Sequence, residues 1–320
     1  MPTLLISLSA FAASAQICLT TGDMDEATRS ALVNTGKRFY DMAAHGDAAL
    51  LRQNAITSLA TNFSGVEGAV KDSQANLAAV QPALRLPFLL KAEATEPLAR
   101  AEFLCGVFGA QGQTRDSAVF VIPNLPPGNY GIVTLDAAST RGAYTVSFVL
   151  QQQAGDWKLG GFYVRLTQVA GHDGNWFADR AREFKAKGQN RNAWFYYGEA
   201  RELLVPVPFM ATATTDKLYD EMQTVKPADL PPLDLTAGAK TYKLIDLFPV
   251  PVGQDFNLVV KYQSADVSDS GRTFQDNGAV MKALVAKYPE LRDGFAGIVV
   301  RAVEPSGRDY GSMLAMKDIK

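Results

Sequence analysis

The chain has 320 residues, of which 47% are hydrophobic and 20% are charged. This is an ordinary globular composition, and the length suffices for two or three domains, so extensive disorder is not expected. The formal net charge is −2 and no run of Lys or Arg stands out, so the basic surface typical of a nucleic-acid-binding protein is missing.

The N-terminal segment, residues 1–15 (MPTLLISLSAFAASA), is apolar and ends in small residues. Ala13 and Ala15 are spaced as in an A-x-A cleavage signal, with Gln16 as the next residue. This pattern predicts a signal peptide and an exported protein, periplasmic or secreted, although no Lys or Arg precedes the apolar run. A buried N-terminal strand or helix is the alternative. No later stretch approaches 18 consecutive apolar residues, so we expect no transmembrane segment after the signal peptide.

The chain contains two cysteines, Cys18 and Cys105. An oxidising compartment would permit a disulfide between them. Because Cys18 follows the predicted cleavage site closely, in a segment expected to be mobile, we predict two unpaired thiols instead.

Residues 25–46 predict an amphipathic helix, because Leu32, Phe39 and Ala43 recur at helical spacing. His45 falls in its last turn, where a partly charged imidazole favours the negative end of the helix dipole, and the following glycine ends the helix. This position gives His45 a structural rather than a catalytic interpretation.

Two further helices are predicted before the first strands. Asp47 can cap a short second helix. Ser64 and Glu67 have the spacing of a capping box, with Ser64 as the predicted N-cap. The helix that follows carries Val66 and Val70 along one side.

After Pro82 the pattern changes from helical to extended. Strands are predicted at residues 102–108, 117–122, 130–136, 143–152 and 157–166. The last two form a long antiparallel hairpin around an Ala-Gly-Asp turn, and the first of that pair alternates apolar and polar residues as a half-buried strand does.

The doublet Gly160-Gly161 interrupts the last of these strands. Leu159 before the doublet and Phe162 after it would point to opposite faces in a regular strand. One extra residue at the doublet restores a single apolar face, which predicts a β-bulge that bends the strand. A ligand-facing glycine site is the alternative.

The order of these elements resembles the nuclear-transport-factor-2-like fold over residues 25–168. The likeness lies in RFYDMAAHGDAALL, at the end of the first helix, and in YTVSFVLQQQAGDWKLGGFYV, at the terminal hairpin. The resemblance implies an α+β domain in which a cone-shaped, curved antiparallel sheet wraps around N-terminal helices. Another α+β fold is the alternative.

The same resemblance implies a pocket. Proteins similar to ketosteroid isomerase and scytalone dehydratase use the open end of the cone as an apolar cavity with Tyr, Asp or His side chains pointing inward. The candidate lining residues in this chain are Tyr40, Asp41, Tyr130, Tyr144 and Tyr163. They match no catalytic motif, and packing tyrosines beside a solvated Asp41 are the alternative.

Residues 172–225 predict a helical segment, in which ADRAREFKAKGQNRNAWFYYGEARELLVP resembles one tetratricopeptide repeat. Gly188 lies at the turn, and Ala193 and Ala200 are small enough to let two helices approach closely, with Tyr197 between them. Solenoids need about three repeats to bury a continuous face, so one unit predicts a packing hairpin rather than a peptide-binding groove.

An aromatic block, Trp194 to Tyr197, lies in the second helix of this hairpin. Four consecutive helical residues point in all directions, so some of these rings must meet another domain or a ligand. We expect interdomain packing, and Trp194 and Tyr196 are the candidate interaction surface.

The rest of the chain divides into a Pro-rich linker at 226–240 and a C-terminal α+β domain at 241–320. Strands are predicted at 241–248, 257–263, 298–303 and 312–316, with a helix at 274–288 between the two pairs. This order is ββαββ.

No cofactor or metal site is predicted. His172 and Asp173 lie close to other oxygen ligands, but the segment lacks calcium-loop and zinc-site spacing and reads as a helix cap before Trp176. The glycines of residues 106–112 lack both the phosphate-loop ending and the dinucleotide spacing, and predict a turn.

The sequence therefore favours a non-catalytic exported protein that binds a protein or a cell-envelope component. This interpretation rests mainly on an absence, because the sequence contains no recognisable group of catalytic residues. The two folds that it resembles, nuclear-transport-factor-2-like and tetratricopeptide-like, often serve in binding. The alternative is a small-molecule binder or acid/base enzyme that uses the cone pocket. A third interpretation is a structural part of a larger assembly.

Overall fold

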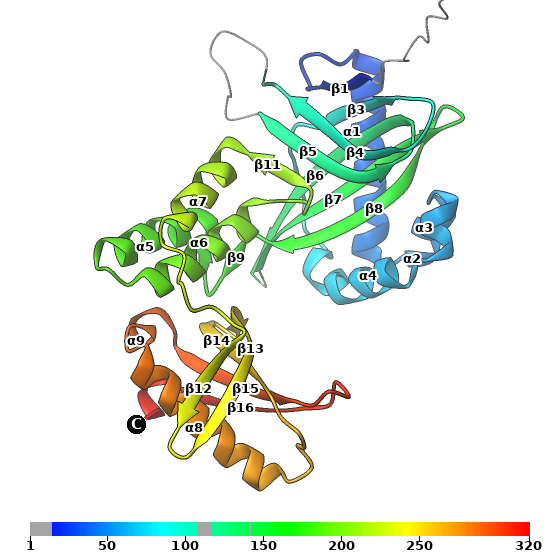
Figure 1. Ribbon diagram of the computed structural model, residues 1–320. Coiled ribbons are helices and arrows are strands. Elements are labelled where there is room, and N and C mark those ends of the chain that lie inside the picture. The colour runs from blue at the N-terminus through cyan, green and yellow to red at the C-terminus, as the bar shows by residue number, and fades with distance from the viewer. Residues whose placement is uncertain (1–14, 108–116, 141) are drawn as a thin grey trace, which may run out of the picture. The chain divides into compact units, whose positions relative to one another are not determined.

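The computed structural model describes residues 15–107, 117–140 and 142–320 (Figure 1). Residues 1–14 of the predicted signal segment and most of the glycine-rich stretch 106–112 lie outside these residues. The described chain is α+β and divides into two compact units. Unit 1 comprises the residues up to Leu166 together with Val205–Thr214, and unit 2 comprises Thr167–Leu204 and Thr215–Lys320. Within the described ranges, no helix combines the length and the hydropathy needed to span a membrane.

Unit 1 has helices near its N-terminus and two antiparallel sheets. The helices are α1 (Glu26–His45), α2 (Ala48–Gln53), α3 (Thr57–Thr61) and α4 (Ser64–Leu77). The larger sheet has the order β1-β3-β6-β7-β8, with β2 beside β6: β1 (Ala15–Leu19), β2 (Ala83–Leu84), β3 (Phe88–Glu93), β6 (Gly128–Ser139), β7 (Gly142–Gln153) and β8 (Asp156–Leu166). The smaller has the order β11-β5-β4: β4 (Leu98–Cys105), β5 (Ala118–Leu125) and β11 (Met210–Thr212).

Helix α1 has the bounds that its sequence signals predict. The Asp25 side chain accepts a hydrogen bond from the Thr28 N–H at 2.8 Å, and Gly46 ends the helix with φ of 78°. Phe39 and Ala43 are fully buried, as the helical spacing predicts.

The predicted capping box at Ser64 is wrong. Ser64 is already helical in α4, and the N-cap is Phe63, which makes no side-chain capping bond. Phe63 is only 2% exposed. The packing of the Phe63 side chain therefore determines where α4 begins. This tertiary contact cannot be predicted from the local capping pattern.

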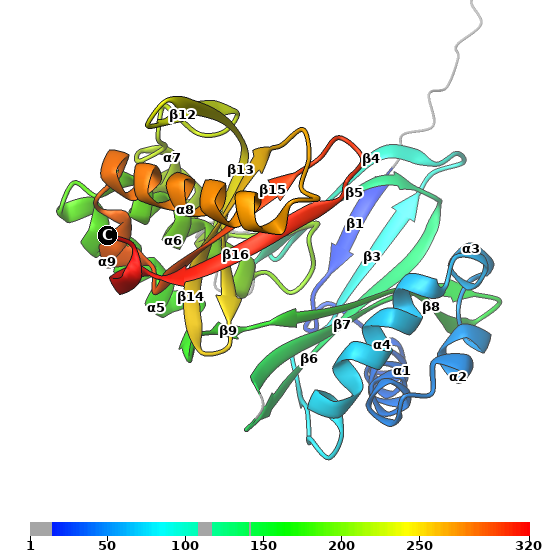
Figure 2. The same ribbon diagram turned by 90° about the horizontal axis from the view of Figure 1, so that it is seen from below.

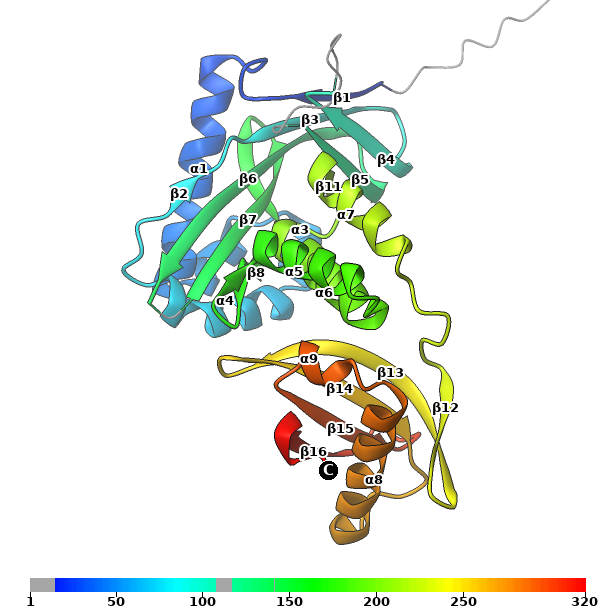
Figure 3. The same cartoon turned by 90° about the vertical axis from the view of Figure 1, so that its left-hand side faces the viewer.

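The larger sheet of unit 1 separates two apolar clusters. The helices pack on one face, where Phe39 of α1 meets Phe148 of β7 with ring centroids 5.9 Å apart. The hairpin of β4 and β5 packs against the other face (Figure 3). Val207 belongs to the same cluster. Val207 lies far along the chain from these strands. This second cluster is therefore complete only when residues 205–214 pack in unit 1.

The prediction of two unpaired thiols is wrong, because Cys18 and Cys105 form a disulfide with Cα atoms 5.1 Å apart. Cys18 is not in a mobile segment but in β1, which pairs with β3 along its whole length. The pairing of β1 carries Cys18 to the second cluster, where Cys105 of β4 is fully buried.

The predicted β-bulge at the glycine doublet is confirmed. Leu159 pairs with Leu150 and Gly161 pairs with Val149, so Gly160 is the extra residue of β8. As a result Leu159 and Phe162 both join the cluster on the helical face. The bulge also lies beside the helices, since the backbone of Leu159 exchanges hydrogen bonds with the segment around α2 and α3.

Unit 2 combines the helical segment with the C-terminal sheet. Its helices are α5 (Gly174–Ala186), α6 (Asn190–Leu204), α7 (Ala213–Gln223), α8 (Ser270–Lys287) and α9 (Leu291–Gly294). The sheet has the order β12-β13-β14-β15-β16: β12 (Leu233–Ala237), β13 (Lys240–Val252), β14 (Asp255–Gln263), β15 (Gly297–Val303) and β16 (Asp309–Ala315). Short strands β9 (Gln168–Val169) and β10 (His172–Asp173) precede α5. Helix α8 connects the parallel strands β14 and β15 and lies along the sheet (Figure 2).

One apolar core extends through the whole of unit 2, so the helical segment and the C-terminal domain predicted as separate parts are continuous. Phe256 of β14 contacts Phe177 of α5 and Tyr196 of α6, with ring centroids 5.0 and 5.2 Å away. The predicted ββαββ order is present, with β12 added from the predicted linker 226–240.

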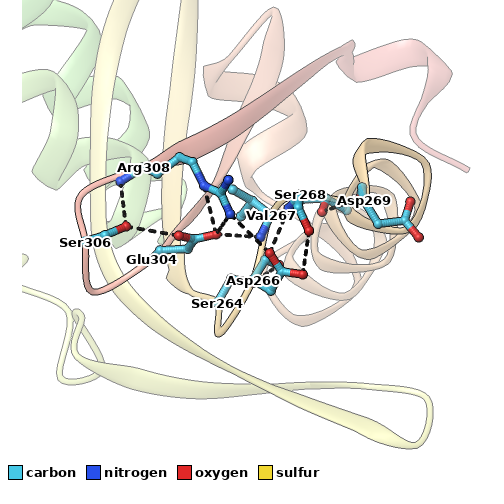
Figure 4. A network of polar contacts seen from close by, with 9 residues as sticks. Ser264, Asp266, Val267, Ser268, Asp269, Glu304, Ser306 and Arg308 are labelled. Atoms are coloured by element: carbon cyan, nitrogen blue, oxygen red, sulfur yellow. Dashed lines mark hydrogen bonds and ion pairs between the residues drawn. The ribbon is translucent and has the colours of Figure 1, made fainter.

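A polar network fixes the loop before α8 to the turn between β15 and β16 (Figure 4). Glu304 accepts hydrogen bonds from the Val267 N–H at 2.7 Å and from the Arg308 guanidinium at 2.6 Å. These bonds hold the pKa of the Glu304 carboxyl below its usual range, the Arg308 bond most strongly. Asp269 caps α8 by accepting from the Arg272 N–H. Glu304 and Asp269 therefore have structural roles, because their carboxylates hold the loop and cap the helix.

Candidate functional site

A pocket of about 400 Å³ opens in unit 2, lined by residues of α6, α7 and β13. Its walls are mostly aromatic and apolar, and its charged groups all come from α6. The lining residues are Trp194, Phe195, Gly198, Glu199, Arg201, Glu202, Met222, Leu247, Phe248 and Pro249.

Helix α6 presents its two faces to different surroundings. Small and aromatic side chains, Ala193, Tyr196 and Ala200, are buried against the rest of unit 2. Glu199 and Glu202, one helical turn apart, are on the pocket side. Gly198 leaves room beside them, since a Cβ added there would meet only the Met222 methyl carbon at 3.7 Å.

The Glu199 carboxyl is held in an unusual electrostatic environment. Burial, together with the nearby negative charge of Glu202, raises its pKa to about 7. Among the described residues, no hydrogen bond or ion pair compensates the Glu199 charge. A half-buried carboxylate in an apolar pocket without a partner favours a cation or a proton at this position.

Two cations beside the pocket, Arg201 and Lys226, are engaged with other groups. The Arg201 guanidinium donates to the Thr215 carbonyl at 3.1 Å and lies 4.9 Å from the centre of the Tyr219 ring. Lys226 lies over the ring of Trp194, with its ammonium 5.9 Å from the ring centre. These cations therefore leave the Glu199 charge uncompensated.

A second lysine, Lys261 of β14, lies beside the β13 wall of the pocket. The Lys261 ammonium lies 5.0 Å from the centre of the Phe248 ring and 3.7 Å from the Asp246 carboxylate. The aromatic rings of Trp194 and Phe248 thus each already hold one ammonium group.

The edge of β13 beside the pocket is poor in hydrogen-bond donors. Strand β12 pairs with β13 only as far as Leu244, so beyond it β14 is the one neighbouring strand in the part of the chain described. Pro249 and Pro251 have no N–H, and proline is tolerated in strands where that position faces an open edge. The Leu247 N–H donates to the side chain of Asp246 at 3.0 Å. This edge therefore offers mainly carbonyl acceptors.

The five candidate pocket residues from the sequence do not converge on one site. Tyr40 is 1% exposed in the cluster on the helical face and donates to the Leu77 carbonyl, while Asp41 is exposed. Tyr130 and Tyr163 pack in the cluster on the other face of the sheet.

Tyr130 and Tyr163 both make structural contacts within this cluster. The Tyr130 hydroxyl donates to the Pro126 carbonyl at 2.7 Å, and the ring of Tyr163 packs edge-on against Phe209. Tyr144 is half-buried on β7 and lies two residues before Val146, so it is on the helical face of the sheet. The larger sheet therefore separates Tyr40 and Tyr144 on one face from Tyr130 and Tyr163 on the other.

The aromatic block contributes differently at each ring. Trp194 and Phe195 line the pocket, so Trp194 lies where a ligand could reach it. Tyr196 is 6% exposed and donates to the Gly294 carbonyl at 2.7 Å, so it is a packing residue within unit 2.

The two histidines occupy structural positions. The His45 ring nitrogen lies 2.7 Å from the Asp41 carbonyl in the last turn of α1. The His172 ring stacks on Trp176 with centroids 3.6 Å apart, and Asp173 caps α5 by accepting from the Trp176 N–H, as predicted.

Sequence reasoning did not single out Glu199. The only available signal was a pair of glutamates three residues apart directly after an aromatic block, and such a pair usually marks a solvated helix face. The burial of Glu199 depends on α7 and β13, which lie far away in the sequence.

No family model matches this sequence, and neither a curated protein nor a solved structure shows significant similarity to it.

Proposed function

We propose that this protein is a non-catalytic, exported binding protein that recognises a protein or a cell-envelope component through the pocket of unit 2. The ligand group that enters the pocket combines an apolar body with a positive charge. The observation that carries this proposal is Glu199, an uncompensated carboxyl among aromatic walls. A cation that replaced the missing partner would offset the cost of burying this charge.

Export is supported by the disulfide between Cys18 and Cys105, which is compatible with an oxidising compartment. Strand β1 begins at Ala15, next to the proposed cleavage site, and Gln16 to Leu19 would still pair with β3 after cleavage. The disulfide then ties the start of the mature chain to β4.

The family resemblances remain part of the proposal. Support for a nuclear-transport-factor-2-like unit 1 comes from the order of four helices followed by the β3-β6-β7-β8 sheet with a bulged last strand. Support for a tetratricopeptide-like hairpin comes from α5 and α6, which join at Gly188 in a left-handed conformation and pack through Ala193 and Ala200.

The proposed function is tested with three small probes of similar shape. Benzylamine, benzyl alcohol and benzoate are titrated into the protein while the indole NMR signal of Trp194 is followed. We expect benzylamine to bind best and Glu199→Gln to weaken it about tenfold, since roughly 1.4 kcal/mol of ion pairing is lost. Glu67→Gln, an equal charge change on exposed α4 surface, should have no effect. Equal binding of all three probes, or an unchanged affinity in Glu199→Gln, would contradict the proposal.

An acid/base enzyme is the second candidate, because a carboxyl with a pKa of about 7 suits a general base at neutral pH. The pocket would then be that of unit 2 rather than the cone. The test is 5-nitrobenzisoxazole, whose ring opens when a base removes the ring C–H proton and the N–O bond breaks. Turnover above that of carboxylate buffer, lost in Glu199→Gln, would favour the enzyme. Turnover equal to the buffer rate would count against it.

A further inference from the structure

We propose that the group that enters the unit 2 pocket is the guanidinium of an arginine side chain on a protein partner. This inference rests on the proposed function and deepens it, by naming which cation is recognised and what carries it.

The hydrogen-bonding inventory of the pocket favours a cation with many donors. Glu199 supplies carboxylate oxygens, and the β13 edge at Leu247 to Pro249 supplies carbonyl acceptors with few donors. Guanidinium has five N–H donors and no acceptor, so it complements a surface of this kind. A quaternary ammonium has no N–H and would leave these acceptors without partners.

The aromatic walls point in the same direction. Quaternary ammonium ions are recognised by open aromatic cages. Here the rings of Trp194 and Phe248 already hold the ammonium groups of Lys226 and Lys261. The attraction left for an incoming cation therefore comes mainly from the Glu199 carboxylate, which favours hydrogen-bond donors.

Desolvation distinguishes arginine from lysine. A guanidinium is more weakly hydrated than an ammonium and is planar, so it enters a pocket of apolar walls at lower cost. Unit 2 contains an internal example of such recognition. The Arg191 guanidinium lies 3.7 Å from the centre of the Tyr288 ring and forms an ion pair with Asp229.

The β13 edge also constrains how a partner can approach. Addition of a β-strand needs alternating N–H and C=O groups along the edge. Pro249 and Pro251 remove donors from the edge, which disfavours a partner strand. The partner thus presents arginine from a turn or an exposed loop, and the side chain supplies the main contact.

The test uses the full chain and four blocked tripeptides, acetyl-Gly-X-Gly-amide, with X as arginine, lysine, trimethyllysine or citrulline. Citrulline has nearly the shape of arginine without its charge. Binding is measured by calorimetry and by the Trp194 indole signal. We expect arginine to bind at least about tenfold more tightly than the other three, and this advantage to disappear in Glu199→Gln.

Two variants control the result. Gly198→Leu should abolish binding of every peptide, because its side chain fills the pocket while its Cβ clears Met222. Glu67→Gln should bind as the unchanged protein does. Thermal unfolding of each variant shows whether a loss of binding reflects a loss of folding.

The outcomes separate this inference from the proposed function. Lysine or trimethyllysine binding as tightly as arginine would overturn the guanidinium assignment and leave a cation-binding protein. Agmatine, a free guanidinium compound, binding more tightly than the arginine peptide would overturn the protein partner. Citrulline binding as tightly as arginine, together with equal binding of benzylamine and benzyl alcohol, would overturn both proposals.

Discussion

Glu199 shows how a single residue acquires its properties from distant parts of the chain. Its neighbours on α6 make it an ordinary helical glutamate, and the apolar side chains of Met222 and Leu247 change its protonation. No local feature of the sequence indicates that the pKa of Glu199 differs from that of other helical glutamates.

The raised pKa of Glu199 predicts a pH-dependent stability. The folded pKa is about 7 against an ordinary value of 4.5, so the folded state holds this proton more tightly than the unfolded state does. The resulting stability is present below pH 4.5 and is lost as the pH rises to about 7. Glu199→Gln should therefore stabilise the protein at pH 8 by on the order of 1 kcal/mol, a value reduced for solvent screening.

Urea unfolding at pH 8 and at pH 4.5 measures this difference. The advantage of Glu199→Gln should vanish at the lower pH, where Glu199 is protonated. Glu67→Gln serves as the control, with no advantage expected at either pH. An advantage of equal size at both pH values would rule out the protonation of Glu199 as its cause.

At the scale of the element, close packing decides several features that local signals leave open. Helix α1 lies so near β6 that a Cβ added to Gly36 would be 2.4 Å from a methyl carbon of Val133. The helix pattern around Gly36 gives no sign of this contact, because a glycine within a helix is locally only a weak helix former. The bulge in β8, by contrast, was predictable, because the apolar pattern itself shifts by one residue at Gly160.

The contact between α1 and β6 predicts opposite effects for two glycine substitutions. Gly36→Ala should destabilise unit 1 by about 1–3 kcal/mol, because the branched Val133 side chain cannot move aside easily. Gly68→Ala, within α4, has nothing within 4 Å of the new Cβ. It should be neutral or stabilise by up to about 1 kcal/mol through helix propensity.

Thermal unfolding of the two variants against the unchanged protein checks this pair. The matched design removes the common effect of adding a methyl group to a helical glycine. A Gly36→Ala variant as stable as Gly68→Ala would show that α1 does not pack on β6 as closely as described.

On the scale of the whole molecule, the chain passes between its two units more than once. It leaves unit 1 after Leu166, returns for Val205–Thr214, and completes unit 2 afterwards. The sequence predicts a domain that ends at residue 168, and the chain first leaves unit 1 after Leu166. The return was not predicted, because β11 is only three residues long and carries no strong strand pattern.

The return segment predicts how unit 1 behaves when isolated. A fragment of residues 16–166 lacks Val207, which is fully buried, and Phe209, which packs against Phe120 and Tyr163. Joining residues 205–214 to it through a flexible linker should raise its stability by roughly 2–4 kcal/mol, the amount expected for restoring one fully buried and one half-buried side chain.

Thermal unfolding and binding of a hydrophobic dye compare the two fragments. The shorter fragment should unfold at lower temperature and bind more dye, and Val207→Asp in the joined fragment should remove the gain. Equal stability of the short and joined fragments would contradict the assignment of residues 205–214 to unit 1.

The sequence by itself determined the α+β class, the bounds of α1 and α8 to within a few residues, the long hairpin of β7 and β8 and its bulge. All of these follow from apolar periodicity, capping residues and turn residues, which are interactions between residues close together in the sequence. The tertiary structure alone decided the disulfide, the continuous core of unit 2 and the environment of Glu199. Each of these joins residues that lie far apart in the chain, so each depends on burial and contact, which no local pattern encodes.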